Sequence, residues 1–252
     1  MWSWPWKNAV TWLSTRTWWI VFPQPGRWPA RFLASPHSPV PASPMPPRPV
    51  VPQVIVVTPK RVKETDLASL IALARKNPGK LNYASAGSGT SHHLAGELFK
   101  IAAGVDIAHV PHKGAGPALQ DLLSGQQVEM MFDGLGSSAQ HIKSGLIMPL
   151  AVASKTRSAA FPYVPTAAEA GLKGYEVTTW YAMWGVAGSP QPIHDRMVGE
   201  IAKSLATPEI KNLWAQQGAI TGAANPKEMA AFVSAEIAKW AKVAKSANIT
   251  VD

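Results

Sequence analysis

The sequence predicts an α/β fold in which a parallel sheet is flanked by helices. Short runs of β-branched and apolar residues recur from Val54 onward, stretches with apolar residues at helical spacing stand between them, and glycine-rich turns join the two. Strands that alternate with helices form parallel sheets, because each parallel connection needs a long crossover that a helix supplies. The helices are therefore expected on both faces of the sheet.

The first part of this pattern runs to residue 154. Residues 54–57 suit a buried strand, and Thr65 is expected to cap a helix that ends at Pro78 and Gly79. A helix with Leu94, Leu98, Ile101 and Ala102 on one face is expected after the second strand. Strands are expected at residues 80–85, 106–110, 128–132 and 148–154, with a helix after each of the first three.

The second part consists mainly of helices. Residues 175–188 form a long apolar stretch that is expected to be a strand crossing between two lobes, and helices are expected at residues 192–206 and 209–217. The last helix has the clearest start, because Asn225, Pro226 and Glu228 supply an N-cap, a proline at the first helical position and an acid three residues after the cap. Its apolar stripe consists of Met229, Phe232, Val233, Ile237, Trp240 and Ala244. Four tryptophans are expected in the core or between lobes: Trp180, Trp184, Trp214 and Trp240.

The formal net charge of +9 is concentrated at the start of the chain. Residues 1–63 contain eight basic side chains and no acid, whereas the chain from Glu64 onward contains sixteen basic and fifteen acidic residues. The part with predicted strands and helices thus lacks the basic excess that marks a nucleic-acid-binding surface, and no nucleic-acid partner is expected. The chain has no cysteine, which excludes disulfides and thiol chemistry.

The first 53 residues have a composition of their own. Seven of the 11 tryptophans lie within the first 28 residues and 12 of the 23 prolines within the first 52. Proline lacks the N–H donor and restricts φ, so residues 23–52 are expected to be extended and disordered rather than helix or interior strand. No apolar run in this head approaches the ~20 residues of a membrane span or the ~7–15 of a signal-peptide core.

Three loops that follow predicted strands carry the candidate chemistry: residues 85–93, 112–116 and 133–138. Ligands of parallel α/β sheets bind beyond the carboxyl ends of the strands, where these loops are expected to meet. All three are rich in glycine and small hydroxyls, and the first two open onto helix N-termini, which favour an anion. Lys113 adds a positive charge, and Asp133 can accept from a ligand hydroxyl or ammonium. The expected ligands are small organic carboxylates.

Other interpretations of the first loop remain open. The glycine turn lacks the Gly-Lys-Ser/Thr of a phosphate-binding P-loop, and His92 stands where a dinucleotide motif has its third glycine. Gly87 and Gly89 also fit a tight turn that binds nothing.

Metal and catalytic readings have less support. His92 and His93 are adjacent and point in different directions on a helix, and a zinc site needs more ligands than His93 and Glu97 supply. Bonding of one of these histidines to backbone is the favoured role. Ser88 lacks the Gly-x-Ser-x-Gly elbow of a hydrolase, and Asp133 at a strand end is more often a hydrogen-bond acceptor than a general acid or base.

Several motifs occur in one order between Val54 and Asp252. They read NYASAGSGTSHHLAGELF at residues 82–99, HVPHKG at 109–114, PALQDLL at 117–123, MFD at 131–133, VPTAAEAG at 164–171 and AEIAKW at 235–240. With these motifs the chain resembles the Bug-type receptors of tripartite tricarboxylate transporters. The resemblance implies a monomeric, periplasmic, two-lobed receptor of the type II Venus flytrap fold, without cofactor, metal or catalysis, that delivers carboxylates to membrane permease subunits.

The resemblance also implies where the ligand binds. In such receptors the first loop cradles the ligand carboxylate, partly through ordered water, and the other two loops add contacts. Carried over to this sequence, the expected ligand-binding residues are Ser85, Gly87, Ser88, Gly89, Thr90, Ser91, His92, Lys113, Gly114, Ala115 and Asp133.

Two departures from the family pattern stand out. His112 replaces the usual tyrosine before Lys-Gly, a local change that bears on specificity. The family's first lobe, about a hundred residues, has no counterpart in the Trp/Pro/Arg-rich head, whose acid-free composition is typical of a frameshifted or mis-started reading frame. The expected organisation is a disordered head at 1–53, a ligand-binding lobe at 54–174, and a crossover strand with first-lobe helices at 175–252. The alternatives are an enzyme acting on a carboxylic acid, a non-functional truncated receptor, or a head that binds anionic membrane.

Overall fold

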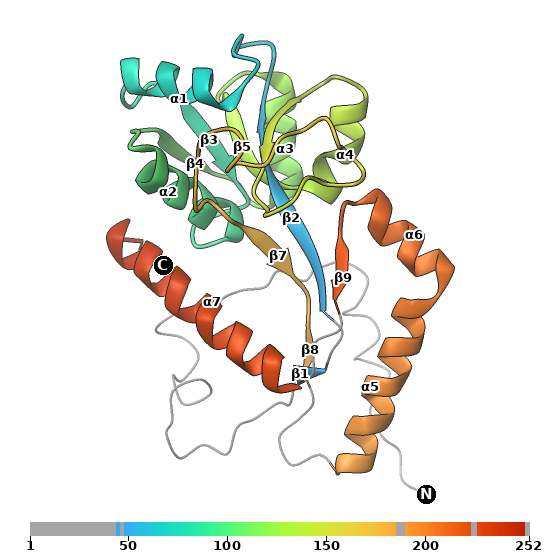
Figure 1. Ribbon diagram of the computed structural model, residues 1–252. Helices are drawn as coiled ribbons and strands as arrows, with labels where there is room; N and C mark the ends of the chain where they lie inside the picture. Colours follow the sequence, from blue (N-terminus) through green and yellow to red (C-terminus); the bar gives the residue numbers. More distant parts are fainter. Residues whose placement is uncertain (1–43, 46–47, 185–189, 223–225, 250–252) are drawn as a thin grey trace, which may run out of the picture.

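A computed structural model describes residues 44–45, 48–184, 190–222 and 226–249 of the 252-residue chain. The predictions for residues 1–43, including disorder of the head, concern residues outside this part of the chain. Figure 1 shows an upper body built from β2 to β6 and α1 to α4, and a lower part that contains β1, β7 to β9, α5 and α6. Helix α7 extends from the lower part to the side of the upper body.

The upper body contains the sheet that the sequence predicts. Its strands lie in the order β4–β3–β5–β2–β6, with β3 (Asn82–Ser85) parallel to both β4 (Ala108–Pro111) and β5 (Met130–Gly134). Strand β2 (Arg48–Val57) is antiparallel to β5 and to β6 (Met148–Val152), so it alone runs against the others. The α/β class is confirmed, but β2 departs from the all-parallel expectation because the chain leaves β2 and enters β3 at the same end of the sheet.

Strand β2 begins at Arg48, earlier than the predicted start at Val54, and Pro49 and Pro52 lie inside it. Its first half pairs with β7 and β9, and its second half with β5 and β6. The prolines are tolerated because each lies where the ladder does not need an N–H. Pro49 is one residue beyond the last pair with β7 and accepts from the Tyr181 N–H, and Pro52 lies between the β9 and β5 ladders. The expectation that proline bars interior strand here was wrong.

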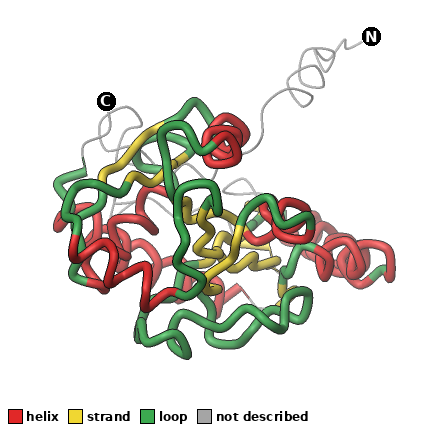
Figure 2. The backbone as a smooth tube through the Cα atoms, turned by 90° about the horizontal axis from the view of Figure 1, so that it is seen from above, coloured by secondary structure: helices red, strands yellow, loops and turns green. Residues whose placement is uncertain are grey.

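Helices cover both faces of the sheet. On one face α1 (Leu67–Lys76) and α2 (Ser91–Ala103) enclose a core with alternate β2 residues such as Ile55, and on the other α3 (Ala115–Ser124) and α4 (Leu135–Lys143) enclose a core with Val54. Figure 2 shows the strands seen from above with helices around them. This arrangement follows from the two-residue period of a strand, which sends successive side chains to opposite faces.

Two local predictions in these helices need correction. The cap of α1 is Asp66 rather than Thr65, and its carboxylate accepts from the Ser69 N–H at 2.8 Å. In α2 the buried face includes Leu94 and Phe99, whereas the predicted Ile101 is 54% exposed and Ala102 is also exposed. The sheet approaches α2 from the side of residues 95, 99 and 103, which helical spacing alone does not select.

The lower part is joined to the upper body by paired strands. β7 (Thr178–Trp180) and β9 (Ile220–Gly222) flank the start of β2, and β8 (Met183–Trp184) pairs with β1 (Pro44–Met45). The predicted strand over 175–188 is thus two short strands, and residues 185–189 lie outside the described part. Helices α5 (Gln191–Ala206), α6 (Pro208–Gln216) and α7 (Pro226–Ser246) lie close to their predicted positions.

Helix α7 rests on the upper body through only part of its predicted stripe. Met229, Trp240 and Val243 are buried, and the last two belong to the core beneath α2, whereas Ile237 is 44% exposed. Trp180 is also buried, as expected. Among the described residues, no helix is long and apolar enough to span a membrane.

Candidate functional site

The three predicted loops meet at one edge of the sheet. β4, β3 and β5 are parallel neighbours, so their carboxyl ends point the same way. The His112 N–H donates to the Ser85 carbonyl at 3.0 Å, which joins the first two loops, and His92 Nε2 lies 3.4 Å from Asp133 Oδ1, which joins the first and third. The expectation that these loops come together is confirmed.

The first loop is a compact turn with its own hydrogen bonds. Gly87 and Gly89 have φ of 131° and 75°, conformations that residues with a Cβ rarely adopt. A Cβ at Gly87 would also stand 3.3 Å from the His112 carbonyl oxygen. Ser85 Oγ accepts from the Gly87 N–H at 3.0 Å, and Thr90 Oγ1 donates to the Gly87 carbonyl at 2.7 Å. Both glycines are therefore needed for the shape of the loop.

Two histidines, one buried and one half-buried, stand behind this loop. His93, in the first turn of α2, accepts from the Gly89 N–H through Nδ1 at 3.0 Å. Its ring stacks on that of His109 from β4, with centroids 3.8 Å apart and planes 6° from parallel. His109 Nε2 lies 2.6 Å from Ser85 Oγ. The bond from Gly89 confirms the predicted backbone role for one of the adjacent histidines, and His92 points elsewhere, toward Asp133.

Burial keeps these histidines neutral. It lowers the pKa of His93. Burial also lowers the pKa of His109 to about 3, and repulsion from the neighbouring His93, Lys100 and His112 contributes to this shift. Burial also lowers the pKa of His92, opposed by the charge of Asp133. A neutral His93 ring is what the loop requires, because Nδ1 must carry a lone pair to accept from Gly89.

Asp133 lies inside the protein rather than on the loop surface. It is 1% exposed, and its Oδ2 accepts from Ser137 and Ser138 hydroxyls, each at 2.7 Å. Its Oδ1 faces His92. Tyr181, from the lower part, lies near enough for the Asp133 charge to raise its pKa further after burial has raised it. The carboxylate thus links the third loop to α4 and to the first turn of α2.

The second loop places Lys113 in solvent. The side chain is exposed, and Gly114 and Ala115 begin α3 at a half-buried position. The neighbouring His112, the residue that departs from the family pattern, turns toward α3, where Nε2 lies 3.0 Å from Asp121 Oδ2. Ser88, Thr90 and Ser91 likewise remain exposed or half-buried at the start of α2.

Several residues of this edge were not singled out from the sequence. His109 and Tyr83 come from neighbouring strands, and Tyr83 stacks on His109 with centroids 5.0 Å apart. Tyr181 comes from the lower part, and its ring centroid lies 5.8 Å from that of Trp214, one of the four tryptophans expected in the core or between lobes. No local pattern indicates that Tyr83, His109 and Tyr181 gather here, because their ring partners lie on other elements.

The contact between Ser85 and His109 does not form a hydrolytic centre. A serine nucleophile must reach its substrate, and Ser85 is fully buried. Its hydroxyl is also tied to both the N–H and the carbonyl of Gly87. Within the described ranges, no cluster of three or more histidine, aspartate or glutamate side chains suits a metal ion.

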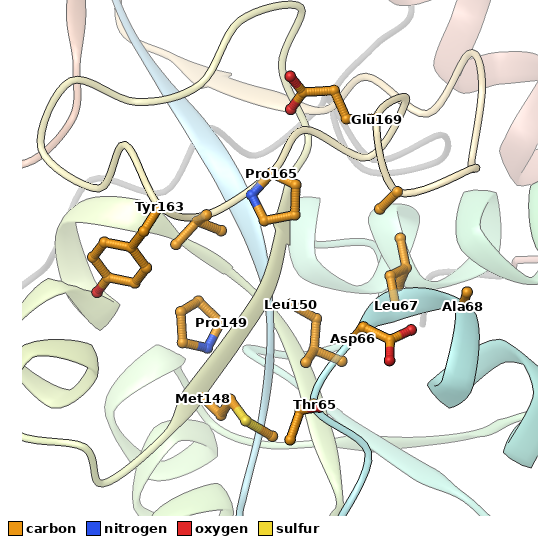
Figure 3. Close-up of a pocket in the computed structure, with 12 residues that line it drawn as sticks. Thr65, Asp66, Leu67, Ala68, Met148, Pro149, Leu150, Tyr163, Pro165 and Glu169 are labelled. Carbon is orange, nitrogen blue, oxygen red and sulfur yellow. The ribbon is translucent and has the colours of Figure 1, made fainter.

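An open pocket of about 560 Å³ lies away from the three loops, between the start of α1 and β6 (Figure 3). Its wall combines apolar side chains such as Met148 with the carboxylates of Asp66 and Glu169. Hydrogen bonds from Ser69 lower the pKa of Asp66, and those from Thr166 and Arg157 lower the pKa of Glu169, so both remain ionised. The lining residues include no lysine or arginine, and Arg157 is already paired with Glu169 at 2.9 Å, so the pocket is poorly suited to a carboxylate ligand.

Comparison with known proteins identifies the class. The structure of R. palustris Rpa4515 with adipate is similar, with a TM-score of 0.76 and 35% identity over 87% of this chain and 73% of that one. The structure of the periplasmic binding protein BugD has a TM-score of 0.74 and 33% identity over 83% and 70% of the two chains. Together with the α/β architecture, this likeness shows that the chain has the fold of periplasmic binding proteins.

The family follows from the sequence match. Residues 43–249 match the family model of the tripartite tricarboxylate transporter family receptor, and the chain therefore belongs to this receptor family. It is 35% identical to BugT of Bordetella pertussis over 192 residues, which are 76% of this chain and 59% of BugT. The chain spans less than two thirds of the length of such curated relatives. Members of this family are solute receptors rather than enzymes.

Proposed function

We propose that this chain acts as a receptor that binds small organic carboxylates for a tripartite tricarboxylate-type permease. The meeting of three glycine- and hydroxyl-rich loops at the ends of adjacent parallel strands supports this proposal. Two of the loops lead into helix N-termini, where N–H groups without intrahelical partners favour an anion. Rpa4515, which was solved with adipate, provides a ligand of this class in a protein of similar fold.

The proposed site assigns different roles to the predicted residues. The exposed and half-buried residues of the first two loops contact the carboxylate, directly or through water: Ser88, Thr90, Ser91, Lys113, Gly114 and Ala115. Gly87 and Gly89 shape the first loop, since their N–H groups already donate to Ser85 and His93. Ser85, His92 and Asp133 support the site from behind, because all three are buried.

The proposal includes the organisation and location of the protein. Residues 54–174 form the ligand-binding lobe, and residues 175–252 belong to the crossover and the first lobe, as the junction of β2 with β7 and β9 supports. The receptor works in the periplasm as a monomer, without cofactor, metal or catalytic residue. Its small-molecule partner is a carboxylate and its protein partner is the permease.

Calorimetric titration of the full chain with adipate, malate, glucose and calcium tests the function. Adipate or malate should bind, and the other two should not. Lys113→Gln should weaken binding by about tenfold, because it removes the positive charge nearest the loops. Lys76→Gln, an exposed lysine in the last turn of α1, is the matched control and should leave affinity unchanged. Absence of binding by both dicarboxylates, with or without binding of glucose or calcium, would refute the proposal.

A further inference from the structure

Among the hydrogen bonds that hold the loop from Ser85 to Thr90, two form anchor points near its start and its end. At its end, the Gly89 N–H donates to His93 Nδ1 at 3.0 Å. At its start, the Gly87 N–H donates to Ser85 Oγ, and that oxygen lies 2.6 Å from His109 Nε2. Each anchor therefore ends on an imidazole ring, although the two rings come from different elements, α2 and β4.

The two imidazoles pack face to face. Their centroid distance of 3.8 Å and interplanar angle of 6° describe a close parallel stack. Tyr83 also packs on His109, and its hydroxyl donates to Glu97 Oε1 at 2.7 Å. Lys100 Nζ also lies 3.2 Å from the Glu97 carboxylate. A displacement of either ring would thus disturb the stack, the tyrosine and both loop anchors together.

We propose that the stacked His93–His109 pair positions the carboxylate-binding loop, with His93 holding Gly89 and His109 holding Gly87 through Ser85. The inference rests on the proposed function, since it concerns the same loop. Neither histidine touches the ligand. The pair orients the loop's exposed groups, among them Ser88 and Thr90, before a ligand arrives, which lowers the ordering cost of binding.

Two pairs of variants separate hydrogen bonding from simple packing. His93→Asn keeps an acceptor near the position of Nδ1 and His93→Leu removes it, while His109→Gln keeps a polar group near Nε2 and His109→Leu removes it. His141→Leu, in the last turn of α4, provides the same chemical change away from the loop. All variants are made in the full chain.

Backbone amide exchange of the ligand-free protein, followed by NMR, is the first readout. His93→Leu should speed exchange at Gly89, and His109→Leu at Gly87, by about tenfold, the effect of losing one hydrogen bond. The Asn and Gln variants should restore most of the protection, and His141→Leu should not change it. The amide of Phe99, in the buried part of α2, serves as the reference and should keep its rate.

Adipate affinity is the second readout, and the Leu variants should lose about tenfold while the polar variants lose less. Unchanged exchange at Gly87 and Gly89 would overturn the inference, as would equal losses in the Leu and polar variants or equal acceleration at Phe99. If the unmodified chain binds neither adipate nor malate, the proposed function fails, and the exchange rates still decide whether the pair positions the loop.

Discussion

Gly96 shows how one residue without a side chain sets the distance between α2 and the sheet. A Cβ at this position would lie 2.3 Å from the Tyr83 ring, far inside van der Waals contact. Tyr83 in turn packs against His109 and Phe132, so it has little room to move. The close approach of α2 to β3 is therefore a condition for the histidine stack behind the loop.

We expect Gly96→Ala to destabilise the protein by about 2 kcal/mol, because overpacking a core outweighs the gain in helix propensity. Gly199→Ala is the matched control, since Gly199 lies in α5 with no atom within 4 Å of a Cβ there. The control should be neutral or stabilising by up to about 1 kcal/mol. Urea unfolding followed by circular dichroism measures both. Equal stability of the two variants would contradict the contact with Tyr83.

At the scale of the element, α2 and β4 bring together three histidines whose pKa values in the folded protein differ from those in the unfolded chain. His92, His93 and His109 all have a pKa below the ordinary value, burial being the largest cause. The Glu97 charge opposes the lowering of the His93 pKa. Lys100 lowers the pKa of both His93 and His109, and His112 lowers the pKa of His109 further. The folded state thus binds fewer protons than the unfolded chain in mildly acidic solution.

This difference predicts the direction of the pH dependence. The neutral histidines contribute fully to the free energy of unfolding above about pH 6.5, which is their pKa in the unfolded chain. This contribution is lost as the pH falls toward their pKa values in the folded protein. The free energy of unfolding should therefore decrease from pH 7 to pH 5. The double variant His93→Asn/His109→Gln should show a shallower decrease, because two titrating groups are gone. Urea unfolding at several pH values tests this, and parallel curves for the two proteins would count against it.

On the scale of the whole molecule, α7 links the crossover to the upper body. Glu236 Oε2 accepts from the indole N–H groups of Trp180 on β7 and Trp240 on α7, at 3.3 and 3.1 Å. Lys239 Nζ donates to the Glu176 carbonyl, and Trp240 packs in the core beneath α2. One half-buried carboxylate thus satisfies two buried indoles from segments far apart in the sequence.

Replacing Glu236 with leucine should cost about 2 kcal/mol, because two buried N–H groups lose their acceptor. Glu236→Gln keeps an acceptor oxygen and should cost less. Glu200→Leu removes an exposed partner of Lys203 and should change stability by less than about 0.5 kcal/mol. Tryptophan fluorescence during urea unfolding reports the change directly. A loss for Glu200→Leu as large as that for Glu236→Leu would contradict the bridging role.

The sequence by itself determined those features that depend on neighbours along the chain. Helical spacing, two-residue strand periods and turn-forming residues are local, and they located β3 to β6, α5 to α7 and the three loops to within a few residues. The glycines of the first loop also predicted its tight turn. The family motifs predicted the receptor class, which the comparisons confirmed.

Only the tertiary structure decided what depends on partners distant in sequence. β2 pairs with residues 73 to 174 positions further along the chain, and that pairing, rather than proline content, set its direction and its start at Arg48. Burial of Ser85 and Asp133, the stacking of His93 on His109 and the sharing of Glu236 by two tryptophans likewise arise between elements. The physical reason is that burial and hydrogen bonding depend on which surfaces face one another, and local patterns do not specify this.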